Sequence, residues 1–199
     1  MLIKKNQLPI LLTVSIALVF FANVFFLKQN YEFMVYIGVT LFFVLLVIFT
    51  NWKVHYPNRI LWGLTVWAIL HLAGGGLSFD GIRCYELMLI NLIGEPYHIL
   101  RYDQFVHAFG FFIATLTMYH LLKPMIKEKT RWIAMSIVII SAGLGAGALN
   151  EIIEFTTTIF IQNTGVGDYI NTSLDLVSDL VGAVLGMIYI RYRHNKEFT

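Results

Sequence analysis

Apolar residues run in long stretches along this chain, and short polar segments separate them. Six stretches reach the ~20 mainly apolar residues that a helix needs to cross a hydrocarbon core about 30 Å thick. They cover approximately residues 8–27, 31–50, 58–78, 101–122, 131–158 and 172–190. The pattern therefore predicts an all-α, polytopic membrane protein with six transmembrane helices, built as a single membrane domain over residues 1–199.

The segment from Phe79 to Leu100 is the one long connection between the predicted helices. Its apolar run from Leu87 to Ile93 is too short to cross a membrane. Backbone polar groups cannot remain unsatisfied in lipid. We therefore expect this segment to lie at the outer interface or to dip back into the membrane as a lid.

Basic residues concentrate on one side of the predicted helices. Loops rich in Lys and Arg remain cytoplasmic. With the N-terminus inside, the cytoplasmic segments hold eleven of the 14 basic residues, namely Lys4, Lys5, Lys53, Arg59, Lys123, Lys127, Lys129, Arg131, Arg191, Arg193 and Lys196. The distribution predicts that both termini are cytoplasmic and that the connection 79–100 faces outward.

Composition agrees with a membrane protein and excludes several other classes. Hydrophobic residues make up 58% of the chain and charged residues 13%, with a mean hydropathy of +0.72, which excludes an ordinary water-soluble domain. The single cysteine, Cys84, allows no disulfide within the chain and no CxxC motif. The chain has no G-x-S-x-G, P-loop or H-E-x-x-H motif and no basic, aromatic-rich surface for nucleic acid.

Ionisable residues nevertheless occur inside the predicted spans. Each costs about 2.5–3.5 kcal/mol on insertion scales, so they are rare unless pairing or function retains them. Three pairs at helical spacing and one further histidine stand out: Asp103 with His107, Glu151 with Glu154, Asp175 with Asp179, and His71. Each pair projects from one face of its helix.

These residues also lie at similar depths. His71, His107, Glu151 and Asp179 each fall six or seven residues from the predicted outer end of a helix, which corresponds to roughly 10 Å below the boundary. The other three acidic residues lie about one turn closer to that boundary. The sequence therefore predicts one polar cluster in the outer half of the membrane.

Five carboxylates gathered in a medium of low dielectric constant require a positive partner. One or two divalent ions, Zn²⁺, Mn²⁺ or Fe²⁺, meet this need, because carboxylate and imidazole ligands from facing helices build such centres. The expected ligands are His71, His107, Glu151, Asp175 and Asp179. The candidate catalytic residues are Glu154, as general base, and Asp103. A proton or ion relay and purely structural pairing remain open as alternatives.

Small residues flank two of the acidic pairs. Gly143, Gly145 and Gly147 precede the Glu pair, and Gly182 and Gly186 form a G-x-x-x-G after the Asp pair. Because small residues let helix backbones approach closely, we expect the fifth and sixth helices to cross tightly beneath the cluster.

The cluster motifs resemble those of known membrane proteins. The strings Y-D-Q-F-V-H-A-F-G (102–110), N-E-I-I-E (150–154) and D-L-V-S-D-L-V-G-A-V-L-G (175–186) resemble the bacterial inner-membrane family typified by YjdF. More distantly they resemble VanZ-like proteins, in which D-K-x-x-H, E-x-x-Q and D-x-x-x-N blocks follow in the same order. Here Glu154 and Asp179 stand at the Gln and Asn positions, which makes this site more acidic. The resemblance implies a bacterial multi-helix membrane protein.

Together these features favour metal-assisted hydrolysis or group transfer on a lipid or envelope precursor, at a site facing outward from the bacterial plasma membrane. Membrane lipids are the expected partners. The alternatives are a cation or proton transporter and a non-catalytic envelope-binding or resistance protein. Nothing in the pattern indicates an oligomeric state.

Overall fold

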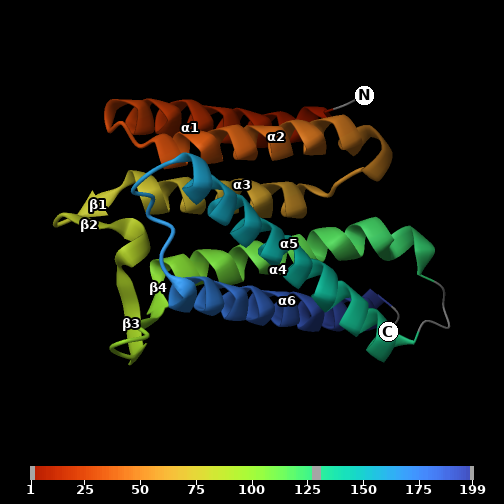
Figure 1. Ribbon diagram of the computed structural model, residues 1–199. Helices are drawn as coiled ribbons and strands as arrows, with labels where there is room; N and C mark the ends of the chain where they lie inside the picture. Colours follow the sequence, from red (N-terminus) through yellow and green to blue (C-terminus); the bar gives the residue numbers. More distant parts are fainter. Residues whose placement is uncertain (1–2, 127–130, 198–199) are drawn as a thin grey trace.

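The computed structural model describes residues 3–126 and 131–197, with side chains described up to residue 194. Lys127 and Lys129 and the side chain of Lys196, which the charge count includes, lie outside this description. Six long helices make up most of the described chain (Figure 1): α1 (Leu8–Leu27), α2 (Tyr31–Val54), α3 (Asn58–Gly76), α4 (Tyr102–Leu122), α5 (Trp132–Phe160) and α6 (Tyr169–Glu197).

Five of the six helices are long and apolar enough to cross a membrane, namely α1, α2, α4, α5 and α6. The protein is therefore a multi-pass membrane protein, as the hydropathy pattern predicted. Helix α3 has 19 residues, but it carries Arg59, His71 and three terminal glycines, which lower its apolar content below that of the other five.

The connection between α3 and α4 departs from an all-α fold, because it forms two antiparallel hairpins. Strand β1 (Ser78–Phe79) pairs with β2 (Ile82–Arg83), and β3 (Met88–Ile93) pairs with β4 (Ile99–Arg101). Asp80 and Gly81 both have positive φ, as a two-residue turn of type I′ requires. The six residues of β3 are all exposed. The expected short apolar segment is thus a strand whose backbone pairs with β4.

The two ends of the molecule differ in composition. The hairpins, the α1–α2 turn and the α5–α6 connection lie at one end, and both termini lie at the other (Figure 1). We call these the hairpin end (β1–β4, with 28–30 and 161–168) and the termini end (3–7, 54–58, 122–126 and 191–197). The start of α4, the last third of α5 and the start of α6 carry the acidic pairs. All three lie toward the hairpin end.

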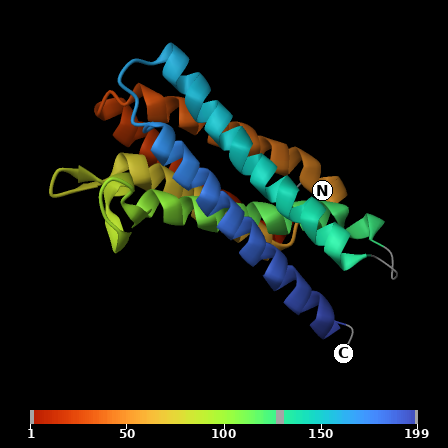
Figure 2. The same ribbon diagram turned by 60° about the horizontal axis from the view of Figure 1, so that its bottom comes forward.

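Helices α4 and α6 pack together more extensively than any other pair of elements, and Figure 2 shows α6 lying along this part of the bundle. A Cβ on Gly182 would overlap the carbonyl oxygen of Ala108, and a Cβ on Gly186 would lie 3.0 Å from that of Phe112. The G-x-x-x-G of α6 therefore faces α4, and not α5 as the sequence pattern predicts. Gly143 and Gly147 of α5 do meet Ala183 and Asp179 of α6.

The three glycines that end α3 make room for aromatic rings. A Cβ at Gly74, Gly75 or Gly76 would overlap Tyr85, Phe33 or Phe21 respectively. The first of these rings belongs to the hairpin connection. The glycines thus hold the connection and the ends of α1 and α2 tightly against α3.

A candidate metal centre at the hairpin end

Helices α4, α5 and α6 bring their acidic pairs together around one histidine. His107 lies in the second turn of α4 and is 5% exposed. Its Nδ1 lies 2.9 Å from Oδ1 of Asp179 and 3.8 Å from Oε1 of Glu151, while its Nε2 lies 3.7 Å from Oδ1 of Asp103. The imidazole therefore has a carboxylate on each side.

The shortest of these contacts is a hydrogen bond. An ionised carboxylate can only accept, so with Asp179 ionised Nδ1 carries a proton and donates it to Asp179. This leaves Nε2, on the side of Asp103, able to accept a proton or bind a metal ion. The hydrogen bond fixes both the tautomer and the orientation of the ring.

Several carboxylate oxygens of the cluster are buried without a hydrogen bond. Among the described residues, Oε1 of Glu151, Oδ1 of Asp175 and Oδ2 of Asp179 are inaccessible and make no hydrogen bond. Asp175 and Asp179 are 1% and 0% exposed. Buried polar atoms without partners cost about 1–3 kcal/mol each, and more when charged. These oxygens are therefore available to a ligand.

Among the residues that the structure describes, two overlapping groups have donor atoms close enough to share an ion. Asp103, His107 and Asp175 form one group, and His107, Glu151 and Asp179 form the other; within each, the donor atoms lie within 4.8 Å of one another. Carboxylate oxygens with one imidazole suit Zn²⁺, Mn²⁺ or Fe²⁺. The arrangement can hold one or two divalent ions.

One side chain that the sequence analysis did not single out, that of Asn171, completes this centre. Asn171, one turn before Asp175 on α6, donates from Nδ2 to Oδ2 of Asp175 at 2.6 Å. Gly147 of α5 lies directly against Asp179, where any side chain would overlap the carboxylate. The i, i+4 spacing of Asn171 and Asp175 is visible in the sequence, but an amide alone carries no signal of a site.

The structure places His71 outside both groups. Its Nδ1 lies 2.6 Å from the hydroxyl of Tyr85, and the rings of Phe33, Tyr36 and Trp67 surround it. Burial and the negative charges of Asp103 and Glu154 raise the pKa of Tyr85 well above its usual value. Tyr85 thus stays protonated and shares a hydrogen bond with Nδ1 of His71, in which the tautomer of His71 decides the donor.

Glu154 is likewise absent from the two groups. It lies one turn from Glu151, is half-buried, and accepts a hydrogen bond of 2.8 Å from Nδ2 of Asn150. Glu154 therefore lies beside the cluster, and its oxygens are not among the donor atoms grouped with His107.

Comparison with known proteins agrees with the helical pattern. No curated protein and no solved structure matches the chain. A family described as "Predicted membrane protein (DUF2238)" matches residues 8–196, which covers the six helices except the last residue of α6, together with the hairpin connection. The match accords with the resemblance to a membrane family of unassigned activity. The chain belongs to this family of predicted membrane proteins.

Proposed function

We propose that this protein is a metal-dependent hydrolase or transferase of the bacterial plasma membrane that acts on a lipid or envelope precursor. One observation supports the proposal above the others: three buried, unpartnered carboxylate oxygens converge with the imidazole of His107. Hydrogen bonding between helices would leave no such surplus of acceptors.

The charge balance of the cluster calls for a cation. Asp103, Glu151, Asp175 and Asp179 surround one imidazole, which supplies at most one positive charge. Two like charges 4 Å apart repel by about 4 kcal/mol at an effective dielectric constant of 20. A divalent ion removes this repulsion and also satisfies the free oxygens.

The two nitrogens of His107 suggest how the ligands divide. Nδ1 donates to Asp179, and a metal-bound histidine commonly donates its other N–H to a carboxylate in this way. We therefore place the principal ion at Nε2, with Asp103 and Asp175 as its other ligands. In this assignment Asp103 is a ligand, and Asp179 orients the ring. The free oxygens of Glu151 and Asp179 could hold a second ion.

The remaining carboxylate, Glu154, is the proposed general base. It stands one turn from Glu151 without being part of either ligand group. A bound metal would polarise a phosphoryl or carbonyl oxygen of the substrate and lower the pKa of water. Glu154 would accept the proton of the attacking water or hydroxyl group.

We further propose that all six helices cross the membrane as a single domain, with both termini in the cytoplasm. Two features support this: both termini lie at the same end of the bundle (Figure 1), and basic residues dominate that end. The centre then opens toward the outer face, beneath the two hairpins. The hairpins would control access from the outer leaflet, as lids do in other enzymes. The block order that resembles VanZ-like proteins accords with an envelope-facing site.

Labelling of single cysteines tests this orientation. Cys84 is buried and burial raises its thiol pKa, so the native thiol should react slowly and give little background. We expect a membrane-impermeant maleimide to label Asn91→Cys, in exposed β3, on intact spheroplasts. Lys53→Cys, exposed at the termini end, should react only after lysis. The reverse pattern would contradict the proposed orientation.

Activity is tested on whole lipid extracts, because the substrate is defined only by class. We expect purified wild-type protein with Mn²⁺ or Zn²⁺ to convert at least one species in a bacterial lipid extract, as measured by mass spectrometry. Asp175→Asn and Glu154→Gln should each lower the conversion by at least about a hundredfold, since general bases contribute about 10²–10⁴. Identical extracts after incubation with wild type and variants would contradict an enzymatic function.

Transport is the alternative that the helices support less well. Between His107 and Tyr119 of α4, between residues 132 and 151 of α5, and between Asp179 and Tyr189 of α6, the described chain has no ionisable side chain. A cation would find no charged site beyond the cluster. Saturable uptake of metal ions by proteoliposomes would reverse this preference.

A further inference from the structure

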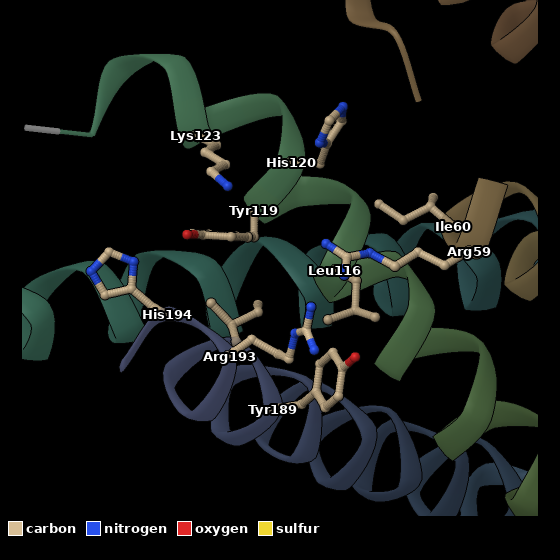
Figure 3. A pocket seen from close by; sticks show the side chains of 10 residues that line it. Arg59, Ile60, Leu116, Tyr119, His120, Lys123, Tyr189, Arg193 and His194 are labelled. Carbon is tan, nitrogen blue, oxygen red and sulfur yellow. The ribbon is translucent and has the colours of Figure 1, made fainter. Parts of the chain in front are cut away.

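A strongly basic cavity lies at the termini end of the bundle, far along the helices from the acidic cluster. The start of α3, the end of α4 and the end of α6 enclose it (Figure 3). Among the described residues, its lining includes Arg59, Lys123 and Arg193, two tyrosines (Tyr119 and Tyr189) and no carboxylate. The cavity thus concentrates positive charge where three helices meet.

The two arginines point their charge into this space. Figure 3 shows the guanidinium groups of Arg59 and Arg193 reaching toward Leu116, and the hydroxyl of Tyr189 lies on the same side. Neither arginine forms an ion pair or hydrogen bond with any part of the chain that the structure describes. Both are exposed. Their donors are available to an anion from outside the chain.

The cavity has the size of one tetrahedral anion. Its volume is about 60 Å³, whereas a single water needs roughly 10–15 Å³ of the same measure. Guanidinium groups bind phosphate oxygens with two parallel hydrogen bonds, and tyrosine hydroxyls can donate a further one. A phosphate group therefore fits this space in both size and chemistry.

Aromatic residues place the cavity at the level of lipid headgroups. Trp52 and Trp62 are 51% and 40% exposed near the same end, and tryptophan favours the membrane interface. Arg191 lies 4.5 Å from the ring centre of Trp132 at the start of α5. Ile188 of α6, 59% exposed, continues the surface of that helix toward the hydrocarbon core. A lipid with its phosphate in the cavity could lay its acyl chains there.

We propose that this cavity binds the phosphate of an anionic phospholipid, held by Arg59 and Arg193. The inference does not depend on the proposed metal chemistry, because it uses other residues at the opposite end of the helices. Basic pockets between transmembrane helices are known to take anionic headgroups. A lipid bound there would contact α3, α4 and α6 together.

Native mass spectrometry of the detergent-purified full chain tests the proposal. Phosphatidylglycerol and phosphatidylcholine with identical acyl chains are titrated separately. We expect wild type to retain one phosphatidylglycerol preferentially. The double variant Arg59→Gln with Arg193→Gln should bind it about thirtyfold more weakly, at about fivefold for each basic residue. Arg59→Lys with Arg193→Lys keeps the charge and should recover part of the binding.

A matched control separates this site from general surface charge. Lys5→Gln with Lys53→Gln removes the same charge at the same end without touching the cavity, and should leave binding within about twofold of wild type. Equal losses in the two double variants would overturn the proposal. A further arm adds inorganic phosphate: if phosphate at equal concentration displaces the lipid fully, the site binds free phosphate and the lipid assignment is wrong. Thermal unfolding curves confirm that each variant is folded.

Discussion

Replacing His107 with alanine should remove bound transition metal from the purified protein. His107 is the one residue common to both candidate ligand groups, and its nitrogens lie within 4 Å of Asp103, Glu151 and Asp179. Loss of even an orienting partner typically lowers metal affinity by about 10–100-fold. We expect His107→Ala to weaken binding by at least about a hundredfold, measured by elemental analysis and by competition with a chromogenic chelator.

Two other histidines provide controls for this variant. His120 lies on the same helix at the termini end, where Nε2 contacts the carbonyl oxygen of Val54 at 3.1 Å. His120→Ala should retain the full metal content. His71→Gln should also retain it if Tyr85 is the true partner of that ring, whereas loss of metal would favour the original assignment of His71 as a ligand. Equal metal content in wild type and His107→Ala would refute the metal centre.

Conservative replacements of the two α6 aspartates separate ligand from orienting residue. Asp179→Asn keeps an oxygen that can accept the proton of Nδ1. If Asp179 only orients His107, this variant should bind metal about tenfold more weakly. Asp175→Asn removes a proposed ligand whose second oxygen is buried and free, and should cost at least about tenfold more than Asp179→Asn. If Asp179→Asn weakened metal binding more than Asp175→Asn, the principal ion would instead lie on the Nδ1 side of His107.

Helical spacing along the chain predicted which residues of α4, α5 and α6 lie around His107, but it also predicted His71. Asp103 with His107, and Asp175 with Asp179, stand four residues apart on helices whose apolar length is unmistakable, so each pair had to share a helix face. Counting residues from the outer end of each predicted helix then indicated that the ionisable residues of α4, α5 and α6 lie at a similar depth in the membrane. His71 satisfied the same count, but depth gives no direction around the helix axis. The face of α3 that carries His71 meets Tyr85 and the rings of α2.

The sequence alone did not predict which helix packs against which. The spacing of Gly182 and Gly186 indicates a close contact between helices, but it does not indicate which helix is the partner. In the structure the partner is α4. The hairpins were missed for a different reason. Asp80-Gly81 is a strong signal for a two-residue β-turn, but it stands between strands of only two residues, too short to show alternation of apolar and polar positions.

Gly182→Val should destabilise the protein strongly, because the new side chain meets backbone and not a movable side chain. A Cβ on Gly182 would overlap the carbonyl oxygen of Ala108 and lie 2.9 Å from the amide nitrogen of Phe112. Overpacking of this kind costs about 1–3 kcal/mol or more. For a chain of this size that lowers Tm by about 2–4 °C per kcal/mol, which a thermal unfolding scan in detergent would detect.

Gly145→Val is the matched control, since a Cβ at Gly145 meets nothing within 4 Å. Both variants make the same replacement inside a helix, so the helix propensities change equally. Only the contact between α4 and α6 distinguishes them. That contact also sets the distance from His107 to Asp179, which lies one turn from Gly182. A more stable Gly182→Val than Gly145→Val would therefore contradict the α4–α6 packing, and with it the hydrogen bond that orients the imidazole.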